Sequence, residues 1–330
     1  MTPFLKHKTF FDIFPAPEFL LLSSVGINIT DSTTKFVELK REMLGRGFKL
    51  VRSGKLENPK GAVDSGLINN PAGLIPVLKK ISSDYGIHYA HATLPEERTY
   101  LFTTVIDRVP PEGLRDAVAF IIEENAPVSL ADSIFDFETI DDEGTGKINL
   151  AVSVLPKNIV GAYVELFESA GIVPVSFDLE SQAIARAVVH RGDKRAHLIV
   201  NLGANKSGLY VIEDEVVQFS ITPAYGFGGD DSYLGLSDLK AEMRKVLAFW
   251  NARNSKSGGP GTQIEKIILC GPGASKKDFV DKIMSEVDAK YMLADVWRNT
   301  SPSRDYAPNM PFDESLDYAS AVGLVLPKHK

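Results

Sequence analysis

GINITDSTTK, residues 26–35, is a run of small and polar residues that separates two apolar segments. The pattern predicts a β-hairpin with a first strand that begins at Leu20, a turn at 28–32 and a second strand at 35–39. Small side chains at a hairpin tip let backbone N–H groups approach a phosphate, because each exposed N–H carries partial positive charge. The glycine can also serve only to permit a tight turn, so the hairpin alone leaves both interpretations open.

Two later turns have the same composition. NLGANKSG, residues 201–208, lies between strand-like segments, so the second half of the chain repeats the order of strand, polar turn and strand. CGPGAS, residues 270–275, follows a helical segment at 236–254 and ends an apolar strand at 264–270. The internal repeat predicts two related lobes that face each other.

Between the two hairpins, strand-like and helical segments alternate, as in α/β proteins. The first four of these segments predict a small α+β insertion, and a helix, a strand and a second helix follow it. In chain order they are strand 100–106, helix 112–125, strands 133–139 and 147–154, helix 156–170 with a C-terminal cap at Gly171, strand 173–179 and helix 180–190.

Composition excludes several classes of protein. With 330 residues, 44% of them hydrophobic, the chain can bury a large core, and its net charge of -7 offers no basic surplus for nucleic acid. The single Cys270 excludes an internal disulfide and a multi-cysteine metal site, as is typical of a reducing compartment. No apolar run approaches the roughly 18 residues of a membrane helix, so no transmembrane segment is expected.

The first 19 residues are expected to form an N-terminal arm. Pro15 and Pro17 interrupt the segment, and no small-residue cleavage site follows a long apolar core, so it does not have the pattern of a signal peptide. An alternative is that Phe10, Phe11 and Phe14 dock on a partner or on a membrane surface.

The order of these segments resembles the actin-like ATPases and, among them, the type IV pilus assembly protein PilM family, which is related to the cell-division protein FtsA. The resemblance covers nearly the whole chain from about Leu20 and rests on longer segments as well as on the three turns. These segments are LRDAVAFIIEENAPVSLADSIFDFETI (114–140), YVELFESAGIVPVSFDLESQAIARAV (163–188), LKAEMRKVLAFWNAR (239–253), IEKIILCGPGAS (264–275) and DYASAVGLVL (317–326).

The resemblance implies an actin-like, ribonuclease H-like fold of two lobes, with ATP and Mg²⁺ bound between them. It places a lobe 1A at 20–95 and 158–195, an inserted α+β subdomain 1C at 96–157, and a lobe 2 at 196–330 that includes a small subdomain 2B at about 230–262. The phosphate-binding residues that it implies are Gly26, Asn28, Thr30, Asp31, Ser32, Thr33, Lys35, Asn201, Gly203, Ala204 and Asn205. The residues that it implies around the adenosine and the cleft floor are Gly228, Gly229, Glu242, Lys245, Gly271, Gly273 and Ala274. Glu242 and Lys245 lie three apart on one helix face and can equally be a solvated ion pair.

The chain departs from the family where hydrolysis would be organised. Asn28 and Asn201 stand where aspartates usually position Mg²⁺ through water, and Thr30 stands where glycine is usual. Asparagine lacks the negative charge that a hard divalent cation favours, so metal binding at these two positions should weaken. Asp31 is a candidate substitute carboxylate, and Glu180 is a candidate water-orienting acid. We therefore expect very slow ATP hydrolysis or none.

Other kinds of catalytic site have no support in the sequence. The six histidines show no metal-binding spacing, and the nucleophile-elbow and Walker A patterns are absent.

The resemblance implies a cytoplasmic scaffold of a type IV pilus, or of a related secretion or competence machine. Such a scaffold would bind the cytoplasmic tail of a PilN-like membrane protein in a groove between 1A and 1C, and would lie at the inner face of the cytoplasmic membrane. Self-association of the chain is a further interaction that the resemblance allows. Two alternatives are an active ATPase or small-molecule kinase on the same fold, and an FtsA-like filament former. The latter would normally carry a membrane-targeting C-terminal helix, which LPKHK at 326–330 does not form.

Overall fold

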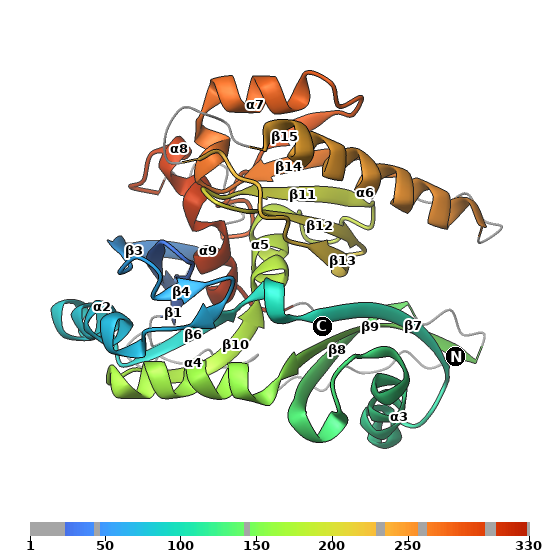
Figure 1. Cartoon of the computed structure of the whole chain (residues 1–330), viewed down its shortest axis with the longest axis horizontal. Coiled ribbons are helices and arrows are strands. Elements are labelled where there is room, and N and C mark those ends of the chain that lie inside the picture. Colours follow the sequence, from blue (N-terminus) through green and yellow to red (C-terminus); the bar gives the residue numbers. More distant parts are fainter. Residues whose placement is uncertain are drawn as a thin grey trace.

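The computed structural model describes residues 24–42, 47–141, 146–228, 235–256, 263–300 and 308–328. These residues form two lobes, each built on a five-stranded mixed sheet, and a separate three-stranded sheet (Figure 1). The predicted mixed α/β architecture is therefore confirmed. The predicted N-terminal arm lies outside the described residues. No helix in the described part of the chain is long and apolar enough to cross a membrane.

Lobe 1 is built on a sheet with one face covered by helices α2 and α4. Strands β1, β2 and β3 form an antiparallel meander, and β1, β6 and β10 are parallel. Ile27, Leu78 and Phe167 are fully buried between the sheet and these two helices. In spatial order the strands are β10 (Val173–Leu179), β6 (Tyr89–Leu94), β1 (Ser24–Ile29), β2 (Thr33–Arg41) and β3 (Phe48–Glu57), and the helices are α2 (Pro71–Tyr85) and α4 (Lys157–Ser169). The short strands β4 (Val63–Asp64) and β5 (Leu67–Ile68) pair with each other beside it.

The insertion between β6 and α4 is a three-stranded antiparallel sheet with helix α3 on one face. Val118 and Ile122 of the helix pack against Leu150 and Val152 of the central strand, and all four are fully buried. Its elements are β7 (Tyr100–Asp107), β9 (Lys147–Pro156), β8 (Ser133–Asp141) and α3 (Pro111–Asn125), and a 3-10 turn, η2 (Glu96–Arg98), connects it to β6.

Lobe 2 repeats the topology of lobe 1. Strands β11, β12 and β13 form an antiparallel meander, and β14 is parallel to β11, as β6 is to β1. The repeated pattern of strand, polar turn and strand in the sequence corresponds to this shared topology. The elements are β13 (Val216–Ile221), β12 (Ser207–Glu213), β11 (His197–Leu202), β14 (Lys266–Cys270), β15 (Tyr291–Leu293), α6 (Leu236–Lys256) and α7 (Lys277–Met284).

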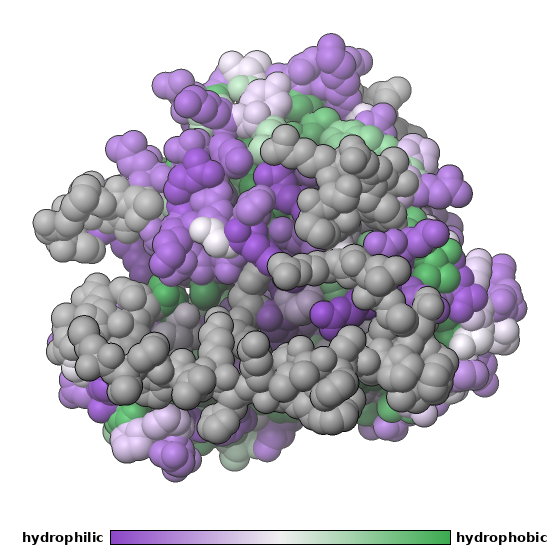
Figure 2. Space-filling view, turned by 180° about the vertical axis from the view of Figure 1, so that it is seen from behind, coloured by the Kyte–Doolittle hydropathy of each residue, from purple (hydrophilic) through white to green (hydrophobic). Residues whose placement is uncertain are grey.

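Viewed from behind, the described surface is mostly hydrophilic, with smaller hydrophobic areas (Figure 2).

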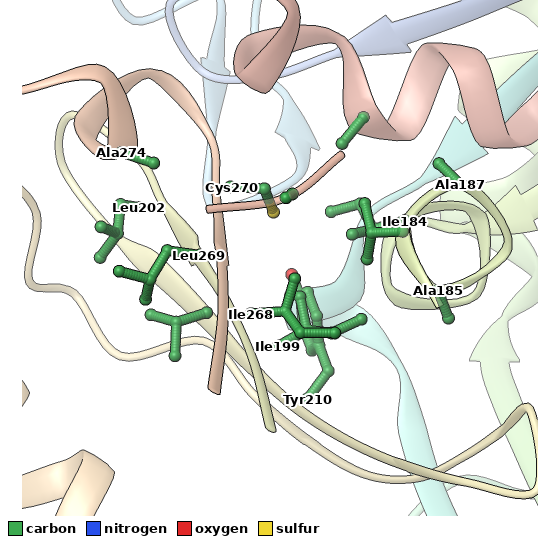
Figure 3. Close-up of a cluster of buried hydrophobic side chains, with 14 of the residues drawn as sticks. Ile184, Ala185, Ala187, Ile199, Leu202, Tyr210, Ile268, Leu269, Cys270 and Ala274 are labelled. Carbon is green, nitrogen blue, oxygen red and sulfur yellow. The ribbon is translucent and has the colours of Figure 1, made fainter. Parts of the chain in front are cut away.

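Helices α5 (Glu180–Val188) and α9 (Ala319–Val325) lie between the lobes (Figure 1). Their backbones approach so closely that a Cβ atom at Gly323 would lie 1.6 Å from the carbonyl oxygen of Ala183. The buried core of lobe 2, which contains Leu202 and Cys270, also includes Ile184 and Ala187 of α5 (Figure 3). A continuous apolar core therefore joins the two lobes below the cleft.

Candidate functional site

A cavity lies between the lobes, where the three turns singled out in the sequence meet. It is lined by the β1–β2 tip of lobe 1, by the β11–β12 tip of lobe 2 and by Pro272 of the third turn. The cavity brings together eleven of the predicted site residues: Asn28, Thr30, Asp31, Ser32, Thr33, Lys35, Glu180, Asn201, Gly203, Ala204 and Asn205.

The first hairpin turn is tighter than the sequence predicts. Asn28 belongs to strand β1, where it pairs with Lys35, and the connection comprises only residues 30–32. The amide of Thr30 donates to the carbonyl of Thr33 at 2.8 Å, and the amide of Thr33 donates to Thr30 Oγ1 at 3.1 Å. Because both amides are bonded within the turn, neither is available to a phosphate.

Asn28 is buried and bonded to lobe 1 itself. Its side-chain amide donates to Thr93 Oγ1 at 3.1 Å and to Glu180 Oε1 at 3.2 Å. Asn201 lies across the cavity, and its Oδ1 accepts a long contact of 3.9 Å from Cys270 Sγ. Among the residues described, no three His, Cys, Asp or Glu side chains are grouped to hold a metal ion. Without a carboxylate at either position, Asn28 and Asn201 do not fit a site for Mg²⁺.

Glu180 is the first residue of α5 and lines the cavity. One carboxylate oxygen accepts from Asn28, and the other accepts from the hydroxyl of Tyr210 at 3.3 Å. Burial and, to a lesser extent, the Glu97 carboxylate raise the pKa of Glu180 to about 7. A carboxyl group with this pKa can exchange a proton near neutral pH, which a general acid or base requires.

Charged groups that the sequence analysis did not select also line the cavity, among them Lys55, Glu97, Lys206 and Asp317. Lys206 Nζ lies 2.8 Å from Asp31 Oδ2 and also contacts Glu97 Oε1, so it bridges the lobes. Lys35 and Lys55 both contact Asp317, with Lys55 Nζ 3.1 Å from Oδ2. Lys206 lies inside the quoted NLGANKSG turn and Asp317 begins the quoted DYASAVGLVL segment, so both could have been noticed there, whereas nothing in the local sequence marks Lys55 or Glu97.

Carboxyl groups outnumber lysines in this lining. The acidic residues are Asp31, Glu57, Glu96, Glu97, Glu180 and Asp317, and the basic residues are Lys35, Lys55 and Lys206. A polyphosphate without a bound cation would therefore meet a site whose formal charge is of its own sign.

Several predicted residues do not line the cavity. A Cβ atom at Gly26 would lie 2.2 Å from the carbonyl oxygen of Ala321, so this glycine permits α9 to pack on the sheet. Glu242 and Lys245 form an i,i+3 ion pair of 2.7 Å on α6, with the lysine 71% exposed, which matches the alternative interpretation of the pair.

Neighbouring protein atoms also fill the space around the glycines of the predicted adenosine-binding turn. At Gly271, where φ is +81°, a Cβ atom would lie 2.4 Å from Asn201 Oδ1, and at Gly273 it would lie 2.9 Å from Leu202 Cβ. Ala274 is buried in the core of lobe 2. The amide of Gly228 donates to the carbonyl of Ala204 at 2.9 Å, and Gly229 lies outside the described residues.

A sequence model of the family described as type IV pilus assembly protein PilM matches residues 26–233. The chain belongs to the PilM family. Its structure is similar to the solved PilM-PilN type IV pilus biogenesis complex, with a TM-score of 0.76 and 18% identity, over 94% of this chain and 98% of that chain. It is also similar to the ethanolamine utilization protein EutJ from Carboxydothermus hydrogenoformans, with a TM-score of 0.50 and 12% identity, over 92% and 89% of the two chains.

No curated protein sequence matches the chain. The family membership and these likenesses confirm the actin-like fold that the resemblance implied.

Proposed function

We propose that this PilM-family chain is an assembly scaffold of a type IV pilus, or of a related secretion or competence machine. In this role it binds the cytoplasmic tail of a PilN-like membrane protein, and that contact holds it at the inner face of the cytoplasmic membrane. The family match over residues 26–233 is the observation that carries the proposal. The likeness to a PilM-PilN complex over 94% of the chain supports the same partner.

The cleft supports a scaffold better than an active ATPase or kinase. Phosphoryl transfer needs an acid that orients the attacking group and a cation that neutralises developing charge. Asn28 and Asn201 supply no charge for that cation, and Asn28 is bonded to Glu180, the candidate water-orienting acid. If ATP binds here, it acts by favouring one arrangement of the lobes, within the limit of its differential affinity for them.

Strand β10 is the surface best suited to a peptide tail. It is an edge strand of the lobe 1 sheet, paired in the described structure only with β6. Its side chains Val173 and Val175 are 51% and 58% exposed, and such an edge can add an extended peptide as a further strand. Helix α4 packs against both β10 and strand β8 of the insertion. A peptide on this edge would therefore lie next to 1A and 1C together.

The test is binding of fluorescently labelled cytoplasmic tails of PilN-like proteins, followed by anisotropy. We expect Val175→Asp to weaken binding at least tenfold, which is about 1.4 kcal/mol, because a carboxylate replaces an apolar contact. The matched control is Val105→Asp on β7, where the side chain is 57% exposed on another edge strand. Absence of binding by every tail tested would contradict the partner. Equal weakening by both substitutions would contradict the β10 surface.

A second test separates the scaffold from the enzyme alternatives. We expect phosphate release from ATP with Mg²⁺ at the rate of the buffer alone. Release that depends on protein concentration and is lost in Glu180→Gln would favour an active ATPase.

A further inference from the structure

Lys206, Asp31 and Glu97 form one ionic contact across the cleft, which we name the Lys206 clasp. Lys206 belongs to the β11–β12 tip of lobe 2, Asp31 to the β1–β2 tip of lobe 1, and Glu97 to the η2 turn at the base of the insertion. A single ammonium group on one of these parts therefore contacts the other two, and the three parts are far apart in the sequence.

The clasp is partly withdrawn from solvent. The side chains of Lys206, Asp31 and Glu97 are 18%, 21% and 20% exposed, so water screens their charges less than at an open surface. Burial alone would lower the pKa of Lys206, but Glu97 and Asp31 outweigh it and hold the pKa above its ordinary value. The lysine therefore carries its charge at every physiological pH.

The ammonium group of Lys206 contacts both carboxylates, so its charge lies where a bound cation would also contact both. Without Lys206 the carboxylates of Asp31 and Glu97 would face each other without a counter-charge, which is unfavourable in a partly buried cavity. Oxygen ligands of this kind are those that Mg²⁺ and Ca²⁺ select. The other lysines of the lining, Lys35 and Lys55, contact Asp317 and offer no replacement for Lys206.

We propose that Lys206 is a built-in cation that takes the place of a divalent metal between the lobes, so that closure of the cleft does not depend on Mg²⁺. This accounts for two observations together. The asparagines at 28 and 201 do not fit a metal, and the carboxylates of Asp31 and Glu97 already share a counter-charge that the chain itself supplies.

The experiment measures the melting temperature of the full chain with EDTA and with millimolar Mg²⁺ or Ca²⁺, without nucleotide. The wild-type melting temperature should be the same in all three. Lys206→Ala should melt at least about 2 °C lower in EDTA, and a divalent cation should restore part of this loss by binding the freed carboxylates. Lys206→Ala combined with Asp31→Asn should show no restoration. Lys194→Ala is the matched control, because its 3.7 Å contact with Asp214 involves a lysine that is 80% exposed.

Two outcomes would overturn the proposal. One is that Mg²⁺ raises the melting temperature of the wild type as much as that of Lys206→Ala. The other is that Lys206→Ala has the same melting temperature in EDTA as with a divalent cation. If Lys206→Ala fails to fold, the wild-type chain still provides a test. Spin labels at Lys80→Cys on α2 and Lys277→Cys on α7, both exposed positions, report the distance between the lobes. We expect the same distance distribution in EDTA and in Mg²⁺. A distance that shortens on addition of Mg²⁺ would show that a metal, and not Lys206, closes the cleft.

Discussion

The hydroxyl group of Tyr210 donates a hydrogen bond to Glu180 Oε2 at 3.3 Å, and this contact joins strand β12 of lobe 2 to the first residue of α5. The tyrosine ring reaches this position by lying over Gly208, where a Cβ atom would be 1.9 Å from the hydroxyl oxygen. Asn28 donates to the other oxygen of the same carboxylate from lobe 1. Glu180 is thus held by both lobes at once.

The raised pKa of Glu180 makes stability depend on pH. Its pKa rises from 4.5 in the unfolded chain to about 7 in the folded chain, so its contribution is complete below 4.5 and is lost as the pH rises through 7. We expect Glu180→Gln to remove this dependence and to exceed the wild type by about 1–3 kcal/mol at about pH 8. The free energy of unfolding in urea, at mildly acidic and mildly basic pH, measures this. Glu242→Gln on the exposed face of α6 is the control. A pH profile of Glu180→Gln that parallels the wild type would refute the assignment.

Restoring the usual acid at position 28 should destabilise the protein more than restoring it at position 201. In Asn28→Asp a carboxylate would face Glu180 Oε1, which lies 3.2 Å from the present amide nitrogen. We expect a loss of about 1–3 kcal/mol at about pH 8 that shrinks in mild acid, where one of the two carboxyl groups takes up a proton. Asn201→Asp should lose less, because Asn201 makes only the long contact with Cys270 in the described structure. Urea unfolding of the two single variants decides this, and equal losses would contradict it.

The crossing of α5 and α9 should tolerate no side chain at position 323. We expect Gly323→Ala to lower the free energy of unfolding by about 1–3 kcal/mol or more, because the added methyl group would overlap the Ala183 carbonyl. Gly161→Ala is the matched control. Gly161 lies within α4 with open space around it, so replacing it with alanine should stabilise the protein by about 0.5–1 kcal/mol. Gly323→Ala with wild-type stability would show that the helices can separate freely.

Cys270 should be inert while the protein is folded. It is fully buried, and burial raises the pKa of its thiol well above the ordinary value. Reaction requires the thiolate, so we expect labelling by a thiol reagent to proceed only as fast as the protein opens. The measurement compares the labelling rate in buffer with that in urea. Rapid labelling in buffer would mean that the core of lobe 2 opens without global unfolding.

The sequence was sufficient for the features that depend on local patterns. The hairpin tips, the insertion and the repeated topology follow from alternation, helical periodicity and small-residue turns, and the structure has them all. The cavity lining was predictable only in part. Periodicity places Glu242 and Lys245 on one face of α6, but it does not predict which face of the helix lies toward the cleft. In the structure the pair does not line the cavity, and Lys245 is exposed to solvent.

Contacts between distant segments account for most of the remaining differences. Gly26 was selected for a phosphate, but α9, which comes almost 300 residues later, needs the space at that glycine. Glu97 belongs to a connection with no pattern of its own, so its contact with Lys206 follows only from the way in which the lobes meet.

Glu96, the neighbour of Glu97, has a different partner, and its carboxylate accepts hydrogen bonds from the amide of Ser181 at 3.1 Å and from Ser181 Oγ at 3.0 Å. The N-cap residue of α5 is Leu179, which cannot supply these bonds itself. The start of this helix is therefore completed by a residue that lies 85 positions earlier, on the far side of the whole insertion. The stability that this cap gives to α5 is therefore gained only once the chain has closed that loop, so we expect loss of the Glu96 carboxylate to weaken hydrogen-exchange protection at the start of α5.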